Sequence, residues 1–473
     1  MSSLLPMSSA STWNHHLEVH KLKRRSSLFV LLGLVCILSF CTQPLAYRAT
    51  AQSALGSDIV WQRTFGGVNG DYGADIVECR DGGYAIIGGT MSAGAGETDA
   101  ILVRTDADGN ELWSQTYGSE GSDSALAIVE CSTGGFAFTG YSRNGTWGRH
   151  NLWLVRTDAS GSVLWERLYG GVDNDQGFAL IEVSTGGFAV AGITRSFGSV
   201  DPRTLIRTFD IWLLRTDTQG HLLWNRTYGG TTDDISHSIV EVPDGGFAFS
   251  GEFNSSYQSV GGGPLIQYHP DAFIIRTDAN GEALWNQTYG GIANDFSRSL
   301  VQLEDGSFAL SGFTNAASED PYDGLFVRTN SSGYNTFRAV HGSAKDDFFQ
   351  AIITCESTGF ALAGYTYISD SADLWVIRTD TEGTPLWVRT FGGPDDDLIR
   401  AGIRSQNGFV FTGYTFSFGA GSRDIWLVKI SDSPPIGSFL VVSGVIATLI
   451  AIVAIGAFIA FQFVKYTRRE PAT

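Results

Sequence analysis

Seven aspartates recur at one position of this sequence and are the first residues that could do chemistry. Each stands four residues after a glycine turn or its equivalent: Asp71, Asp123, Asp175, Asp234, Asp295, Asp347 and Asp397. A ring of carboxylates could hold a cation or another ligand. Aspartates also accept hydrogen bonds from turn amides, and two carboxylates about 10 Å apart repel by only about 0.4 kcal/mol in water. We predict the structural role and leave a cation site open.

A second acidic position is coupled to a basic one at a fixed spacing. An Asp or Asn precedes an Arg or Lys by five residues in Asp99–Arg104, Asn151–Arg156, Asp210–Arg215, Asp271–Arg276, Asp323–Arg328, Asp373–Arg378 and Asp424–Lys429. One active site needs no sevenfold copy of a pair. We therefore expect an ion-pair network between units or a network of turns.

Motifs that would indicate catalysis are missing from the chain. It contains no G-x-S-x-G, no H-E-x-x-H, no P-loop and no G-x-G-x-x-G between a strand and a helix. We predict no catalytic residue, no metal site and no cofactor. The net charge of −18 and the lack of a basic stripe exclude a nucleic-acid partner.

These positions recur because the chain repeats itself. "LVRTDADGNELW" at 102–113 returns four times, and a divergent copy lies at 326–337. An aromatic residue ends each copy, and an isolated N-terminal segment contains another. These seven residues mark the repeat units: Trp61, Trp113, Trp165, Trp224, Trp285, Phe337 and Trp387. A long regular period of this kind is typical of solenoids and propellers.

Each unit reads as four short strands. In the first complete unit these are expected at 74–79, 83–90, 99–105 and 110–117, where β-forming residues are bounded by Gly and Asp. Gly109 supplies the left-handed backbone of the turn inside "DADG". Both faces of such a sheet are apolar, so neighbouring units must cover them, as the blades of a β-propeller do.

The two ends of the repeat array complement each other. A spare fourth strand stands at 58–67, whereas the last unit, 397–430, lacks a fourth strand. We therefore predict an all-β fold, a seven-bladed β-propeller closed by the N-terminal strand. Three cysteines at one repeat position, Cys79, Cys131 and Cys355, replace Val or Leu of other units and are predicted to be buried apolar side chains rather than disulfides or metal ligands.

The segment from turn to Trp resembles the Trp-docking motif of quinoprotein (PQQ-like) propeller repeats, in which a Trp packs between blades. Asp106 and Gly109 are separated by two residues, where those repeats have three, and this ring has seven blades instead of eight. The pattern "D-x-φ-φ-φ-R-T-D…G…LW…YGG" is closer to the uncharacterised repeat propellers of bacterial and archaeal cell surfaces. Such motifs specify architecture and say little about activity.

Both ends of the chain carry membrane signals. A basic and then apolar N-terminus predicts a signal peptide at 1–51, with a retained signal anchor as the alternative. The uncharged stretch 436–464 is long enough to span a bilayer as one C-terminal transmembrane helix, and basic residues follow it in the tail 465–473. The expected topology places a propeller ectodomain at 52–430 and a linker at 431–435 outside the cell, and the tail in the cytoplasm.

Two adjacent long loops, 194–210 and 253–271, depart from the repeat and are the predicted partner site, on the face that carries the Asp ring. The candidate contact residues are Trp147, Arg203, Arg207, Tyr257, Tyr268 and His269. Predicted glycosylation sites are Asn144, Asn225, Asn254, Asn286 and Asn330.

The predicted function is a binding or scaffold module for a protein or glycan, anchored to the cell membrane. The alternatives are an enzyme, either a quinoprotein-like oxidoreductase or a hydrolase that uses the channel mouth, and a structural envelope component.

Overall fold

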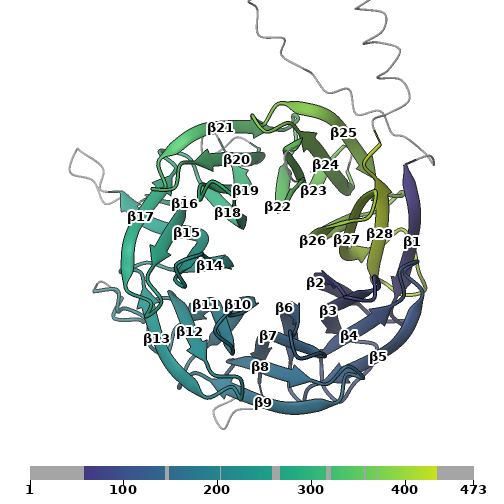
Figure 1. Ribbon diagram of the computed structural model, residues 1–473, viewed down its shortest axis with the longest axis horizontal. Coiled ribbons are helices and arrows are strands. Elements are labelled where there is room, and N and C mark those ends of the chain that lie inside the picture. The colour runs from purple at the N-terminus through teal and green to yellow at the C-terminus, as the bar shows by residue number, and fades with distance from the viewer. Residues whose placement is uncertain are drawn as a thin grey trace, which may run out of the picture. The chain divides into compact units, whose positions relative to one another are not determined.

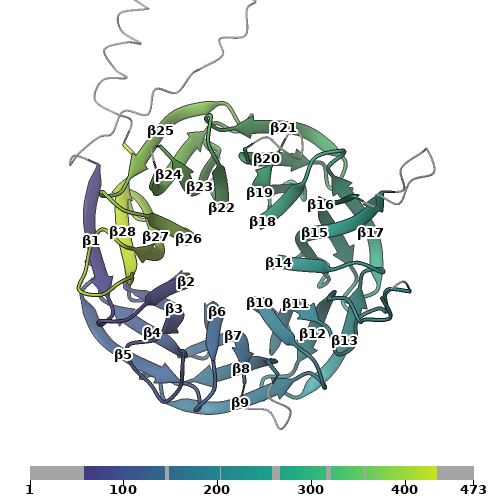
Figure 2. The same cartoon turned by 180° about the vertical axis from the view of Figure 1, so that it is seen from behind.

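The computed structural model describes residues 58–143, 149–202, 204–257, 267–315, 321–355, 358–368 and 370–433. These residues form seven four-stranded antiparallel sheets. Figure 1 shows them as blades around a central axis, and Figure 2 shows the same ring from behind. The predicted all-β, seven-bladed β-propeller is confirmed.

The first four blades follow the chain in order. Blade 1 contains β2 (Asp71–Glu78), β3 (Tyr84–Thr90), β4 (Asp99–Thr105) and β5 (Glu111–Tyr117). Blade 2 contains β6 (Ser124–Glu130), β7 (Phe136–Ser142), β8 (Asn151–Thr157) and β9 (Val163–Tyr169). Blade 3 contains β10 (Asp175–Glu182), β11 (Phe188–Thr194), β12 (Asp210–Thr216) and β13 (Leu222–Tyr228). Blade 4 contains β14 (Asp234–Glu241), β15 (Phe247–Tyr257), β16 (Gln267–Thr277) and β17 (Ala283–Tyr289).

The last three blades complete the ring. Blade 5 contains β18 (Asp295–Gln302), β19 (Phe308–Thr314), β20 (Asp323–Thr329) and β21 (Asn335–His341). Blade 6 contains β22 (Asp347–Thr354), β23 (Phe360–Tyr367), β24 (Ala372–Thr379) and β25 (Pro385–Phe391). Blade 7 contains β26 (Asp397–Ser405), β27 (Gly408–Thr415), β28 (Asp424–Ser431) and, from the other end of the chain, β1 (Ile59–Phe65).

The first strand of each blade lies nearest the axis and the fourth lies at the rim (Figure 1). The two middle strands are buried along nearly their whole length, as in β3 and β4, because adjacent blades cover both of their faces. The rim strand β5 is mostly exposed and carries polar residues. The strands expected in blade 1 are therefore confirmed, except that β2 begins three residues earlier than predicted, at Asp71.

The predicted closure of the ring is also confirmed. β1 pairs antiparallel with β28 from Ile59↔Ile430 to Phe65↔Ile425, which makes it the fourth strand of blade 7. Arg389 of β25 fastens this seam, because its Nε lies 3.2 Å from Asp58 Oδ2 and its Nη1 donates to the carbonyl of Ser431 at 2.8 Å. The two ends of the described propeller are thus bound to each other.

The repeated Trp and Gly explain why blades adhere to their neighbours. A Cβ added to Gly161, in the turn between β8 and β9, would lie 2.9 Å from the ring of Trp113 in the preceding blade. Gly161 has a φ of +84°, a conformation that only Gly adopts without strain. The Tyr117 hydroxyl donates to the carbonyl of the same Gly161 at 2.7 Å. Each "DADG…LW" copy therefore holds one blade against the next.

The three described cysteines are buried free thiols, as predicted for apolar side chains. Burial raises the pKa of Cys79 and that of Cys131 to about 12. These thiols therefore stay protonated and pack as small hydrophobic groups.

No helix among the described residues is long and apolar enough to cross a membrane. The predicted signal peptide at 1–51, the predicted transmembrane helix at 436–464 and the tail at 465–473 lie outside the described residues.

Candidate functional site

The two faces of the ring differ in their connections. The face that carries the connections between second and third strands, such as β3–β4, also carries the start of every first strand, because Asp71 pairs with Thr90 and Thr90 with Asp99. We call it the loop face. The opposite face carries the short turns between first and second and between third and fourth strands, and we call it the turn face.

The recurring aspartates of the first strands lie at the loop face as buried structural groups. All seven side chains, from Asp71 to Asp397, are buried. Asp71 Oδ2 accepts hydrogen bonds from the amide of Gly67 at 2.8 Å and from Ser92 Oγ at 2.7 Å. Asp175 repeats this arrangement with Gly171 at 2.9 Å and Ser196 at 2.7 Å. These contacts agree with the predicted role in turns.

Several of the recurring arginines close turns within their own blade. Arg104 forms an ion pair with Asp81 in the turn between β2 and β3, and it donates to the carbonyl of Tyr84 at 3.2 Å. Arg156 makes the equivalent contact with Thr133 Oγ1 at 3.0 Å. These contacts belong to the turn network. Contacts between blades also occur, because Arg378 of blade 6 forms an ion pair with Asp432 at the end of blade 7, and Lys429 of blade 7 donates to the Tyr84 hydroxyl of blade 1. The coupled Asp99, five residues before Arg104, accepts a hydrogen bond from the amide of Gly96 at 2.8 Å.

The predicted partner residues are only partly described by the structure, and two of them, Arg207 and His269, lie at the loop face. Arg207 is exposed and donates to the carbonyl of Gly198 in its own loop at 2.7 Å. His269 is half-buried, with Nδ1 3.1 Å from Asn294 Oδ1. Trp147 and Arg203 lie outside the described residues, as do the side chains of Tyr257 and Tyr268. This site remains a prediction.

One of the two predicted loops is largely a β-hairpin. β15 and β16 stay paired as far as Tyr257↔Gln267, so most of 253–271 is strand rather than loop. Alternate residues of the two strands exchange backbone hydrogen bonds along this extension, as in any antiparallel pair.

The predicted glycosylation sites fall on the blades. Asn225, Asn286 and Asn330 are exposed. Asn225 Oδ1 accepts a hydrogen bond from Trp212 Nε1 at 3.2 Å. Asn330 Oδ1 accepts hydrogen bonds from the amides of Ser332 and Tyr334, each at 3.0 Å. Asn144 and the side chain of Asn254 lie outside the described residues, and glycosylation remains a prediction.

A feature of every first strand creates a site that the sequence patterns did not indicate. Each of these strands carries a β-bulge, an extra residue that interrupts pairing with the second strand. The bulge residues, in blade order, are Ala74, Leu126, Phe178, His237, Arg298, Gln350 and Arg400. All seven line one cavity of about 520 Å³ at the centre of the ring.

The repeated glycine of the second strand is what permits the bulge. A Cβ at Gly88 would lie 1.8 Å from the carbonyl oxygen of Tyr72, and one at Gly364 would lie 1.7 Å from that of Phe348. Any other residue at these positions would push the first strand away. The final Gly of "GGFAxxG" therefore sets the direction of the channel-lining side chain in each blade.

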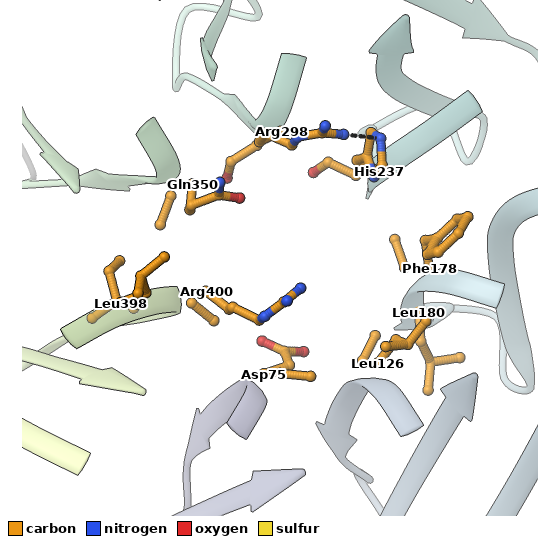
Figure 3. A pocket seen from close by; sticks show the side chains of 18 of the residues that line it. Asp75, Leu126, Phe178, Leu180, His237, Arg298, Gln350, Leu398 and Arg400 are labelled. Carbon is orange, nitrogen blue, oxygen red and sulfur yellow. Dashed lines mark hydrogen bonds between the residues drawn. The ribbon is translucent and has the colours of Figure 1, made fainter. Parts of the chain in front are cut away.

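The cavity has a polar side and an apolar side. Figure 3 shows Arg298 and Gln350 across the opening from Phe178, Leu180 and Leu126, with the guanidinium of Arg400 pointing toward the middle. Polar bulge residues come from the consecutive blades 4 to 7, and apolar ones from blades 1 to 3. A sevenfold scaffold thus surrounds an asymmetric opening.

Two carboxylates modify the charge in and around the cavity. Glu252 Oε2 lies 3.6 Å from Arg298 and 3.1 Å from Nε2 of His237, a ring nitrogen that Arg298 also contacts (Figure 3). Burial and the charge of Arg298 lower the pKa of His237, so its imidazole is neutral at pH 7. Asp75 accepts hydrogen bonds from the amides of Ile76 at 2.8 Å and Ile128 at 2.9 Å, yet burial raises its pKa to about 6.

Aromatic rings gather where the cavity opens toward the loop face in blades 5 and 6. Ring centroids are 4.6 Å apart for Phe296 and Phe313, 4.8 Å for Phe313 and Phe348, and 4.8 Å for Phe348 and Tyr365. We call these four residues the aromatic crescent. They come from the first and second strands of their blades, next to the polar bulge residues.

A second group continues this surface across the seam between blades 7 and 1. The guanidinium of Arg400 lies 5.8 Å from the ring centroid of Tyr72 and 5.9 Å from that of Tyr414. The guanidinium of Arg423 lies 5.2 and 5.0 Å from the same two rings. We call these four residues the arginine–tyrosine cluster.

A signal for this site was present in the sequence. The bulge residue stands three positions after each recurring Asp, and its chemistry varies widely from blade to blade. No group of three or more His, Cys, Asp or Glu that could hold a metal ion occurs in the part of the chain that the structure describes.

Comparisons with known proteins do not assign the chain to a family. No family model matches it. The regulatory protein FlaEY of Caulobacter vibrioides is 26% identical over 229 residues, a match that covers 46% of this chain and 24% of that protein. The chain therefore spans about a quarter of the length of this relative.

Three solved structures match the chain at low sequence identity. The WD40 propeller domain of Doa1 has a TM-score of 0.47 and 13% identity, over 80% of this chain and 98% of that one. A protein of unknown function from Dyadobacter fermentans has a TM-score of 0.44 and 10% identity, over 79% and 98% of the two chains. The WD40 domain of Neurospora crassa Pan2 has a TM-score of 0.43 and 11% identity, over 78% and 98%. These likenesses concern the fold alone.

Proposed function

We propose that this protein is a binding module that holds a protein partner at the loop-face mouth of its central channel. The observation that carries the proposal is the contrast between the repeated scaffold and the bulge position. Turn aspartates, docking glycines and blade cores recur from blade to blade, whereas the seven bulge residues range from Ala74 to Arg400 and face one cavity. One asymmetric ligand accounts for such variation around a symmetric frame.

The side chains at the mouth favour a protein over a glycan. Tyrosine and arginine are enriched among the residues that contribute most to protein–protein binding. The aromatic crescent and the arginine–tyrosine cluster supply both, and the same cavity has an apolar wall that can take a side chain. Sugar hydroxyls would instead call for accessible carboxylates and amides, and Asp75, a carboxylate of the cavity, already accepts two backbone hydrogen bonds.

The position at which the described propeller ends supports display of this mouth away from a membrane. β28 ends at the turn face, where Asp432 forms ion pairs with Arg378 at 3.3 Å and Arg404 at 2.6 Å. Only residues 434 and 435 separate Ser433 from the apolar stretch 436–464, a reach of about 10 Å. If that stretch spans the bilayer, the turn face lies next to the lipid and the loop face points outward.

Affinity capture with the full-length protein tests this function. Cells would carry the parent chain, a mouth variant, Phe348→Ser/Tyr365→Ser, or a rim control, Leu164→Ser/Leu223→Ser. The control residues are exposed on β9 and β13, at 59% and 58%. Phe416→Ser is a second mouth variant. Phe416 is exposed, so its replacement should have little effect on folding, and its ring centroid lies 5.9 Å from that of Tyr414.

The proposal expects one protein to bind saturably to the parent and the rim control and to be lost from both mouth variants. A partner that the mouth variants keep would refute the site. Capture of a glycan alone would refute a protein partner, and no saturable ligand at all would favour a structural envelope component. A visible quinone absorbance band in the purified protein would favour the oxidoreductase.

A further inference from the structure

Two arginines at the mouth differ from the other arginines of the propeller. Most guanidiniums here are neutralised or hydrogen-bonded, as Arg104 is by Asp81, Arg298 by Glu252 and Arg389 by Asp58. Within the described ranges, the side chains of Arg400 and Arg423 make no hydrogen bond and no ion pair. The Nε of Arg423 is buried and has no acceptor. Both guanidiniums therefore keep donor groups that no acceptor of the described residues uses, and a ligand acceptor at the mouth could bind the accessible ones.

The two guanidiniums lie close to the same pair of tyrosine rings, so their positive charges are concentrated in one region of the mouth. The guanidiniums of Arg400 and Arg423 each lie within 5.9 Å of the rings of both Tyr72 and Tyr414. A ring close to a guanidinium limits its motion and leaves its N–H groups free to donate at the edge. The Tyr72 hydroxyl is itself fixed by a 2.6 Å hydrogen bond with Ser124 Oγ. The cluster is therefore held in place before any ligand arrives.

We propose that the arginine–tyrosine cluster binds the carboxylate of an Asp or Glu side chain in an extended peptide segment of the partner. This inference rests on the proposed function and specifies the chemistry of its ligand. The planar guanidinium matches the two oxygens of a carboxylate and can bind both at once. The apolar wall of the cavity, formed by Leu126, Phe178 and Leu180, receives a neighbouring apolar side chain of the same segment.

The charge of the whole protein favours a short acidic segment over a long polyanion. The chain carries a net charge of −18, so a nucleic acid or a heavily sulfated glycan would be repelled over most of the surface. Arg400 and Arg423, with no carboxylate within ion-pair distance in the described residues, form a local exception. A single carboxylate flanked by apolar residues can bind these two arginines, and its neighbours add no negative charge that the rest of the surface would repel.

Fluorescence anisotropy on the full-length protein in detergent tests the inference. One probe is a fluorescein-labelled peptide, Gly-Ser-Glu-Phe-Glu-Ser-Gly, and the other is the same peptide with both Glu replaced by Gln. We expect the Glu peptide to bind at least about tenfold more tightly than the Gln peptide, as charge-assisted hydrogen bonds would give. Arg400→Gln and Arg423→Gln should each remove most of that preference and barely change binding of the Gln peptide.

The control is Arg80→Gln, which removes the same charge from the turn face, where Arg80 is 56% exposed and 3.9 Å from Glu130. Equal affinity of the parent for both peptides, absence of binding by the Glu peptide, or an equal effect of Arg80→Gln would overturn the proposal. So would a heparin fragment that binds through the same arginines where the Glu peptide does not. If Phe348→Ser/Tyr365→Ser abolishes partner capture while the arginine variants do not, the proposed function stands and only the carboxylate assignment fails.

Discussion

Trp426 donates a hydrogen bond from Nε1 to Oε1 of Gln62 at 3.2 Å, although 364 residues separate the two in the chain. Trp426 belongs to β28, the third strand of blade 7, and Gln62 belongs to β1, the N-terminal strand that completes the same blade. The seam that they form is the one place where a blade is built from both ends of the chain. Stability of the ring should therefore depend on a short N-terminal segment.

Deletion of residues 58–65 should lower the midpoint of thermal unfolding by at least about 10 °C, because it removes β1, the partial burial of Trp61 and Phe65, and the partner of Arg389. Differential scanning calorimetry would measure the shift. A chain in which 59–65 is replaced by the equivalent sequence of β9, 163–169, is the control and should keep most of the stability. A deletion variant as stable as the parent would contradict closure of the ring by this strand.

Gly161→Ala should reduce the free energy of unfolding by about 1–3 kcal/mol more than Gly134→Ala does. Both glycines have positive φ, +84° and +86°, so both substitutions carry a similar backbone strain. Only at Gly161 would the new methyl group collide with Trp113 of the neighbouring blade, whereas nothing lies within 4 Å at Gly134. Urea denaturation followed by tryptophan fluorescence would compare them. Equal losses would show that the Trp–Gly contact adds nothing to blade packing.

The stability of the parent relative to an Asp75→Asn variant should increase as the pH falls from 7 to 5. Burial raises the pKa of Asp75 from 3.8 to about 6, so the folded state binds a proton that the unfolded chain does not bind between these two values. Folding is then coupled to proton uptake, and the charged form costs stability above about pH 6. Thermal unfolding of both proteins at each pH would measure the difference. A difference that stays constant, or falls, would show that this carboxyl group does not titrate near pH 6.

Much of the fold could be predicted because its determinants lie close together in the sequence. The anchors from Trp61 to Trp387 set the number of blades, and the unequal ends of the array indicated the seam. Turn residues act over a few positions, so Gly109 could be assigned to a turn. For the recurring Asp–Arg pairs the sequence left two roles open, turns or ion pairs between units, and the structure contains contacts of both kinds. Burial of Cys79, Cys131 and Cys355 followed from their alignment with Val and Leu in other units.

The candidate site was harder to predict. The sequence directed attention to two loops of unusual length. In the structure Arg207 contacts Gly198 of its own loop, whereas His269 contacts Asn294. The described part of the second loop is a hairpin. The bulge residues were missed because a bulge interrupts the alternation of side chains along a strand, so the direction of Arg298 or Arg400 cannot be counted from the pattern.

The sequence by itself determined the blades, their number, the turns within them and the segment that closes the ring, because each depends on neighbouring residues or on the repeat period. The tertiary structure alone decided which side chains share the cavity. Phe178, His237, Arg298 and Arg400 are spread over more than 200 residues of sequence, and they face one opening only because seven sheets close around an axis and each first strand bulges toward it. Closure of the ring converts a position that varies along the chain into one asymmetric binding surface.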